Sequence, residues 1–173
     1  MGFYNSLIIV NNHLEIVQEY KKQKLVPFGE FLPLEKILNK FGLKKITEGY
    51  GSFLKGEQQD NLKIEKLNIL PLICYEIIFT ELAQKAHADT NLIVNISEDA
   101  WFGNSIGPYQ HFAKAVFRAI EQNTFLVRSA NKGISAIIDN KGQIIKKLNL
   151  SEAGNIELEV PLIKTEKRNK NDL

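Results

Sequence analysis

The sequence predicts a layered α/β sandwich built on a mixed sheet, and three observations support this. After residue 67, short apolar runs rich in β-branched residues alternate with helical patterns. Hairpin patterns lie at both ends of the chain, which favours a mixed sheet over a purely parallel one. The chain has 173 residues and is 44% hydrophobic, so it can bury the core of one domain.

The first third of the chain predicts a hairpin followed by a long irregular stretch. Residues 3–10 and 14–20 have the composition of strands, and Asn11 and Asn12 form the expected turn between them. Residues 25–60 contain two prolines and five glycines, and only residues 34–41 show helical spacing. Because long irregular stretches in compact domains are usually functional, we expect a functional loop here.

The remainder predicts alternating strands and helices. We expect strands at residues 67–73, 91–96, 124–129, 134–138, 143–145 and 155–160, and helices at residues 80–88 and 109–122. In the second helix, Phe112, Ala115, Val116, Ala119 and Ile120 recur at the spacing of a core-facing stripe. Residues 139–142 have the composition of a hairpin turn.

Charge and hydropathy exclude several classes of function. The net charge of +2 is too small to indicate a nucleic-acid partner, and residues 163–173 read as a solvated polar tail. No apolar run approaches the ~18 residues that a membrane span needs. The N-terminus also lacks a signal-peptide pattern, so the chain taken alone is predicted to be a soluble polypeptide.

Cys74 is the only cysteine, and it is the most informative residue for function. A single cysteine excludes an internal disulfide and a four-cysteine metal site, which leaves an inert buried residue or a nucleophile. Cys74 follows the strand at 67–73 and precedes the helix predicted to begin at Thr80. Backbone N–H groups and the helix dipole at such a position can lower a thiol pKa and stabilise an oxyanion.

The three histidines show no spacing that implicates them in catalysis. His13 falls in a turn, His87 late on a helix and His111 on the first turn of another. We therefore interpret them as surface residues, and we expect no metal site.

Several ordered motifs resemble the nitrilase, or carbon–nitrogen hydrolase, superfamily. Residues 20–30, with the sequence Tyr-Lys-Lys-Gln-Lys-Leu-Val-Pro-Phe-Gly-Glu, resemble its lysine motif, in the form typical of the apolipoprotein N-acyltransferase family. Residues 73–76, Ile-Cys-Tyr-Glu, are similar to that family's nucleophile segment. The match continues through residues 95–103, 105–111, 118–121 and 128–135, and covers roughly residues 3–162.

The resemblance implies a nitrilase-like α/β sandwich layered α-β-β-α and incomplete on its N-terminal side. It implies a partial carbon–nitrogen hydrolase domain at residues 1–162, followed by the polar tail. The implied reaction moves a phospholipid acyl chain through a cysteine thioester to the N-terminal amine of a diacylglyceryl apolipoprotein, without a cofactor. The implied location is the bacterial inner membrane, with a periplasm-facing domain and membrane helices that this chain lacks.

The resemblance also assigns roles to individual residues. It implies that Cys74 is the nucleophile and that Lys22 stabilises the oxyanion together with the backbone N–H after Cys74. Glu30 matches a carboxylate that positions the lysine or the base. Tyr75 and Glu76 match residues that flank the nucleophile, and Trp101 and Phe102 either pack ordinarily or line an acyl site. We expect a structural ion pair between Arg118 and Glu121, which lie one helical turn apart.

This chain departs from the family in one respect that matters for chemistry. The family's general-base glutamate lies upstream of the part represented here, so the resemblance implies weak or no activity for this chain alone. Residues 25–60 are a candidate lid over a lipid entrance. Two alternatives stay open, namely a soluble amidase that uses the same cysteine and lysine, and a non-catalytic remnant.

Overall fold

The computed structural model describes residues 2–31, 52–84 and 89–163. The chain divides into two compact units, Met1–Gln59 and Asp60–Leu173, each of which is described by itself. The helix expected at residues 34–41, most of the candidate lid and nearly all of the polar tail lie outside the described residues.

Unit 1 is built on the expected hairpin. Strands β1 (Ser6–Val10) and β2 (Ile16–Lys21) pair antiparallel, with Ser6 opposite Lys21. The side chain of Asn11 closes the turn, because its Oδ1 accepts hydrogen bonds from the N–H groups of His13 (2.9 Å) and Glu15 (3.0 Å). After the undescribed segment the chain returns to this hairpin at Gly56, whose N–H donates to the carbonyl oxygen of Lys22 at 2.8 Å.

Unit 2 is a six-stranded mixed sheet in the order β3-β4-β5-β6-β7-β8. The strands are β3 (Leu62–Ile64), β4 (Leu67–Ile73), β5 (Leu92–Glu98), β6 (Phe125–Asn131), β7 (Ser135–Ile138) and β8 (Ile144–Leu148). The three central strands β4, β5 and β6 run parallel, and the outer pairs are antiparallel hairpins. The α/β class with a mixed sheet is therefore confirmed.

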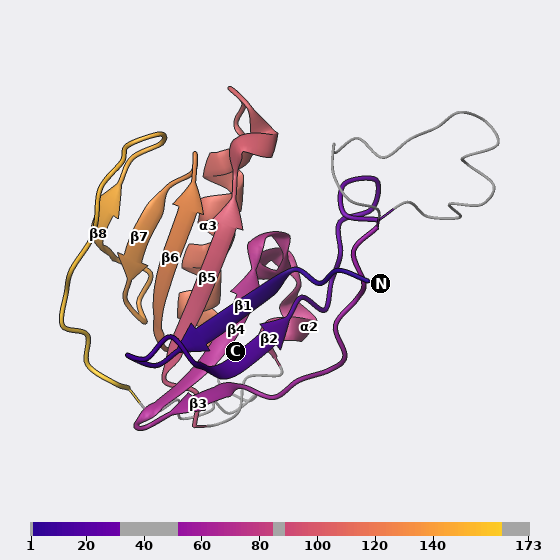
Figure 1. Cartoon of the computed structure of the whole chain (residues 1–173). Helices are drawn as coiled ribbons and strands as arrows, with labels where there is room; N and C mark the ends of the chain where they lie inside the picture. Colours follow the sequence, from indigo (N-terminus) through magenta and orange to yellow (C-terminus); the bar gives the residue numbers. More distant parts are fainter. Residues whose placement is uncertain (1, 32–51, 85–88, 164–173) are drawn as a thin grey trace. The chain divides into compact units, whose positions relative to one another are not determined.

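The helices of unit 2 pack against this sheet. Helix α3 (Gly107–Glu121) lies behind β5 and β6 in Figure 1 and buries Phe112, Ala115 and Ala119, as its periodicity predicts. The short helices η2 (Cys74–Ile78) and α2 (Thr80–Ala83) follow β4 and contribute Ile77 and Leu82 to the same core. The core therefore sits between the sheet and the helices that connect its parallel strands.

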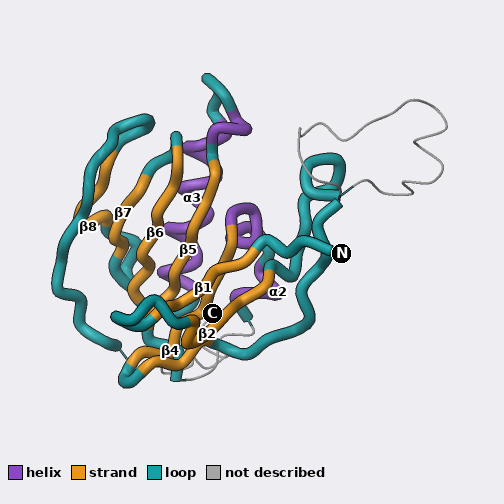
Figure 2. Tube along the Cα trace, viewed as in Figure 1, coloured by secondary structure: helices purple, strands orange, loops and turns teal. Residues whose placement is uncertain are grey.

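The structure corrects one predicted strand and adds one strand that was not predicted. Residues 155–160 form no strand, and Figure 2 shows this segment as loop. Their side chains still alternate between exposed and half-buried, but none of the described strands pairs with their backbone, and a strand requires such a partner. Strand β3, which the sequence did not predict, is only three residues long and pairs antiparallel with β4.

Candidate active site

Cys74 lies at the carboxyl end of β4 and begins η2. Its φ angle is 53°, in the left-handed region that side-chain-bearing residues rarely adopt. The thiol is partly exposed, and its Sγ lies 3.9 Å from the carbonyl oxygen of Glu98. A strained, partly exposed cysteine on a strand-to-helix turn is poorly explained as an inert core residue.

Glu76 holds the backbone on the N-terminal side of the cysteine. Its side chain is completely buried, and its Oε2 accepts a hydrogen bond of 2.8 Å from the N–H of Ile73. Tyr75 is 37% exposed, and its ring centroid lies 5.9 Å from that of His111. Of the two residues flanking the nucleophile, Glu76 therefore fixes the turn, whereas Tyr75 lies at the surface.

A buried polar cluster holds the backbone on the C-terminal side of the cysteine. The Nε2 of His111 lies 3.2 Å from the carbonyl oxygen of Cys74, and its Nδ1 lies 2.9 Å from Oδ1 of Asp99. Arg128 donates from Nη2 to Oδ2 of Asp99 at 2.7 Å. The interpretation of the histidines as surface residues is therefore wrong for His111, which is only 3% exposed.

The signal that could have revealed His111 is the periodicity of α3. His111, Ala115, Arg118 and Ala119 are all buried and share one face of the helix. A histidine on a core-facing stripe must have hydrogen-bond partners in the interior. Those partners, Asp99 and the carbonyl of Cys74, come from other elements, so the stripe alone could not name them.

The charges of the cluster are balanced internally. Burial alone would raise the pKa of Asp99, but the hydrogen bond to His111 and the charge of Arg128 hold it below the ordinary 3.8. Burial lowers the pKa of Arg128, and the charge of Asp99 opposes that effect. Ser97 adds a hydrogen bond of 2.6 Å from its Oγ to Oδ1 of Asp99. An ionised Asp99 is therefore paired and fully hydrogen-bonded, as a buried carboxylate must be.

Unit 1 holds the predicted lysine and carboxylate together. Lys22 follows β2 and is 1% exposed, and its Nζ donates to Oε1 of Glu30 at 2.7 Å. The same carboxylate accepts from Nδ2 of Asn5 at 2.9 Å and from the N–H of Val26 at 2.8 Å. The ammonium of Lys22 is thus fixed by a carboxylate that is itself anchored to the backbone.

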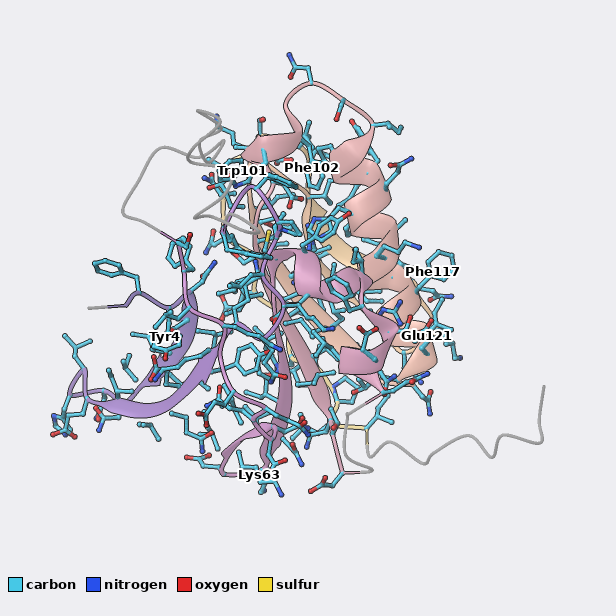
Figure 3. All side chains as sticks on the ribbon, turned by 90° about the vertical axis from the view of Figure 1, so that its right-hand side faces the viewer. Tyr4, Lys63, Trp101, Phe102, Phe117 and Glu121 are labelled. Carbon is cyan, nitrogen blue, oxygen red and sulfur yellow. The ribbon has the colours of Figure 1, made fainter. Side chains whose placement is uncertain are left out.

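The two aromatic candidates follow β5 in the short helix η3 (Ala100–Phe102). Trp101 is 61% exposed, so it does not pack in the core of the described chain. Phe102 is half-buried, and its ring centroid lies 5.4 Å from that of His111. Figure 3 shows both aromatic residues near one end of α3, with Phe117 and Glu121 further along that helix.

The expected ion pair between Arg118 and Glu121 is present on α3. Arg118 is buried, and its Nε also donates to the carbonyl oxygen of Ile77 in η2 at 3.0 Å. This arginine therefore ties α3 to the helix that begins with Cys74, which is a structural role.

The structure brings the predicted site residues together in two groups. Lys22 and Glu30 form one contact pair in unit 1. Cys74, Tyr75 and Glu76 lie in one turn of unit 2, and Phe102 reaches the same His111 ring as Tyr75. Across residues 2–31, 52–84 and 89–163, no three acidic, histidine or cysteine side chains form a metal-binding group.

The family profile described as carbon-nitrogen hydrolase matches residues 1–168. This chain belongs to the carbon-nitrogen hydrolase family. Among curated proteins, it is 43% identical over 159 residues to an apolipoprotein N-acyltransferase of Rhizobium leguminosarum bv. trifolii (strain WSM2304), covering 91% of this chain and 30% of that protein. It is 42% identical over 159 residues to one of Rickettsia typhi (strain ATCC VR-144 / Wilmington), covering 91% and 32%. The chain therefore spans about a third of the length of the curated relatives it matches.

Solved structures support the same fold for this carbon-nitrogen hydrolase chain. An amidase of the nitrilase superfamily from Nesterenkonia AN1 matches it with a TM-score of 0.61 at 19% identity, covering 86% of this chain and 52% of the amidase. At that identity the likeness concerns the fold, and it confirms the nitrilase-like class. In the part of the chain that the structure describes, no helix has the length and apolar character to cross a membrane.

Proposed function

We propose that this chain is the cysteine-bearing part of an apolipoprotein N-acyltransferase. The observation that supports this most directly is the 43% identity over 159 residues to a protein of that name, a match long enough to take in both Lys22 and Cys74. The donor is a membrane phospholipid, and the acceptor is the N-terminal amine of a diacylglyceryl apolipoprotein. The acyl transfer takes place at the bacterial inner membrane. The complete enzyme is about three times as long as the part that this chain matches.

The reaction proceeds in two acyl transfers. The thiolate of Cys74 attacks the ester carbonyl of the phospholipid, and the tetrahedral intermediate collapses with release of a lysophospholipid, whose alkoxide takes up a proton. The acceptor amine then attacks the thioester, loses a proton and releases the thiolate. The family resemblance assigns oxyanion stabilisation to Lys22 and to the backbone N–H that follows Cys74. Within unit 1, Glu30 keeps the ammonium of Lys22 in place.

Acyl-chain trapping on the cysteine tests this function. The 173-residue chain is incubated with detergent micelles that contain phospholipid of one defined acyl length, and its intact mass is then measured. The incubation is carried out at a pH of about 9, because alkaline conditions favour the thiolate, which is the nucleophile, without a general base. We expect a mass increase that follows the acyl length of the donor, is reversed by hydroxylamine and is absent from Cys74→Ala. No adduct at that pH would overturn the proposal.

The role of Lys22 has a matched control beside it. Loss of one oxyanion donor typically costs about 10²–10³ in rate, so Lys22→Met should slow acylation by that factor. Lys21 is partly exposed, and its ammonium pairs with Glu19 at 3.5 Å and lies 4.6 Å from the centroid of the Tyr4 ring. Such surface contacts contribute little, so Lys21→Met should acylate within about threefold of the wild-type rate. Equal rates for the two variants would exclude Lys22 from the oxyanion site.

The amidase alternative gives a different adduct. An amidase of this fold would form a thioester from a short aliphatic amide and would ignore phospholipid. Incubation with each donor separately therefore distinguishes the two activities. A non-catalytic remnant would show neither adduct, and its Cys74 would react with iodoacetamide no faster than a free thiol.

A further inference from the structure

We infer that His111 is a positioning residue for the acyl transfer. It holds the peptide between Cys74 and Tyr75, so that the N–H of Tyr75 is fixed as an oxyanion donor. The inference rests on the proposed function, because it takes that N–H as part of the oxyanion site.

The geometry of one peptide unit carries the argument. The carbonyl oxygen of Cys74 and the N–H of Tyr75 belong to the same peptide, and no described peptide is cis. In a trans peptide these two groups point in opposite directions. Because Nε2 of His111 lies 3.2 Å from the carbonyl oxygen, the N–H of Tyr75 points away from the histidine. A contact on one side of the peptide thus fixes the donor on the other.

The acceptor sets the direction of this hydrogen bond. A carbonyl oxygen only accepts, so the hydrogen lies on Nε2 of His111. Asp99 lies on the other side of the ring, 2.9 Å from Nδ1, and a ring with hydrogens on both nitrogens donates to Asp99 and to the carbonyl of Cys74 at once. Nη2 of Arg128, 3.1 Å from Nδ1, donates to Oδ2 of Asp99.

The turn needs such a support because its backbone is strained. A left-handed φ of 53° at Cys74 costs about 1–3 kcal/mol and persists only where the surroundings enforce it. Glu76 holds the peptide before the strained residue, through the N–H of Ile73. His111 holds the peptide after it. Removing the second contact frees the peptide that carries the proposed oxyanion donor.

The histidine is itself immobilised from outside the turn. Asp99 is 1% exposed and Arg128 is 2% exposed, and Arg128 also donates from Nε to the carbonyl oxygen of Ile134 at 3.2 Å. Gly133 closes the same cluster, because a Cβ there would lie 2.3 Å from Oδ2 of Asp99. Arg128 in β6 and Gly133 in the turn between β6 and β7 thus fix the position of Asp99. Asp99 in turn fixes the position of the His111 ring. A hydrogen bond to the carbonyl also polarises the opposite N–H and strengthens it as a donor.

Two substitutions of similar polarity separate positioning from packing. In His111→Gln the side-chain amide reaches the place of Nε2 and still donates to Cys74. In His111→Asn the shorter amide replaces Nδ1 beside Asp99 and does not reach the carbonyl. If the Asn variant fails to fold, His111→Leu, which also lacks the donor, makes the same comparison. Thermal unfolding of each variant checks that the full chain is folded.

Two reactions of the same sulfur provide the readout. Acylation by a small activated ester such as p-nitrophenyl butyrate passes through an oxyanion, whereas alkylation by iodoacetamide does not. At a pH of about 9, we expect His111→Asn to acylate about 10–100 times more slowly than wild type, and His111→Gln to stay within about threefold. Alkylation should remain within about threefold in both. Because Cys74 is the only cysteine, [1-13C]cysteine labels a single carbonyl, whose NMR shift should change in the Asn variant and not in the Gln variant.

Three results would overturn the inference. Equal acylation by wild type and both variants would show that the contact has no part in the reaction. Parallel loss of acylation and alkylation would show that His111 acts on the thiol itself. Equal losses in the Asn and Gln variants would reduce its role to packing. A wild-type protein that reacts with the activated ester but never with phospholipid would instead refute the proposed function and leave this inference standing.

Discussion

Oε1 of Glu30 lies 2.7 Å from the Nζ of Lys22, and two further hydrogen-bond donors contact the same carboxylate. Asn5 donates to the same oxygen as Lys22, and the N–H of Val26 donates to the second oxygen. The arrangement suits an ionised carboxylate and no other group of this shape, because a carboxylate only accepts.

Glu30→Gln should therefore destabilise the chain although it preserves the side-chain shape. The new amide must turn its NH2 group toward either Val26 or the pair formed by Lys22 and Asn5, and all of these are donors. Breaking a largely buried pair and placing donor against donor should cost about 3 kcal/mol of unfolding free energy. Urea unfolding followed by circular dichroism measures the loss.

Glu19→Gln is the control for this substitution. Glu19 pairs with Lys21 at 3.5 Å, and their side chains are 40% and 36% exposed, so loss of this pair should cost less than about 1 kcal/mol. Equal stabilities for the two variants would mean that the pair formed by Lys22 and Glu30 is no more than a surface contact.

The backbone strain at position 74 predicts an unusual order of stabilities. Glycine adopts a positive φ without steric cost, so Cys74→Gly should be about 1 kcal/mol more stable than Cys74→Ala. At an ordinary helical position the order is reversed. Ala113 is exposed on α3, and Ala113→Gly should lose about 1 kcal/mol. Urea unfolding of the three variants measures these differences. If Cys74→Gly is less stable than Cys74→Ala, the backbone at Cys74 is not strained.

The buried carboxylate of Asp99 predicts a loss of stability in acid. Its pKa is lowered in the folded state, so it stabilises the fold above the unfolded value of about 3.8. That stability disappears as the pH falls from about 3.8 through the lower folded pKa. Over that window the unfolding free energy of wild type should fall more steeply than that of Asp99→Asn, by up to about 1.4 kcal/mol per pH unit. Urea unfolding as a function of pH gives both slopes, and identical slopes would contradict the proposed ionisation.

The exposed ring of Trp101 predicts a chain-length effect if it contacts the acyl donor. Trp101→Ala removes a side chain that is 61% exposed, so stability should change by less than about 0.5 kcal/mol. Acylation of Cys74 by a long-chain phospholipid should slow about tenfold, with little change for a short-chain ester. Phe117 is 55% exposed on α3, and Phe117→Ala should affect neither donor. Equal effects of the two substitutions would show that Trp101 has no specific role in the acyl site.

Local patterns were sufficient for much of unit 2. The apolar run at residues 67–73 is β4 with the expected bounds, and the stripe that includes Phe112 and Ala115 is buried on α3 as predicted. Both follow from periodicity, which depends on neighbours along the chain. The segment at residues 155–160 has a strand-like alternation but no partner strand in the described part of the chain, and pairing depends on segments far away in sequence.

The amino-acid pattern alone was enough to identify the residues available for chemistry, namely a single cysteine after a buried strand and a lysine and a glutamate eight residues apart in one motif. The surroundings of the cysteine depend on the three-dimensional fold. His111 is 37 residues from Cys74 in the chain, and Arg128 is 29 residues from Asp99. Their contacts arise because the parallel strands β4, β5 and β6 end beside one another and α3 lies over them. A pattern of neighbouring residues in the sequence does not predict contacts between such distant segments.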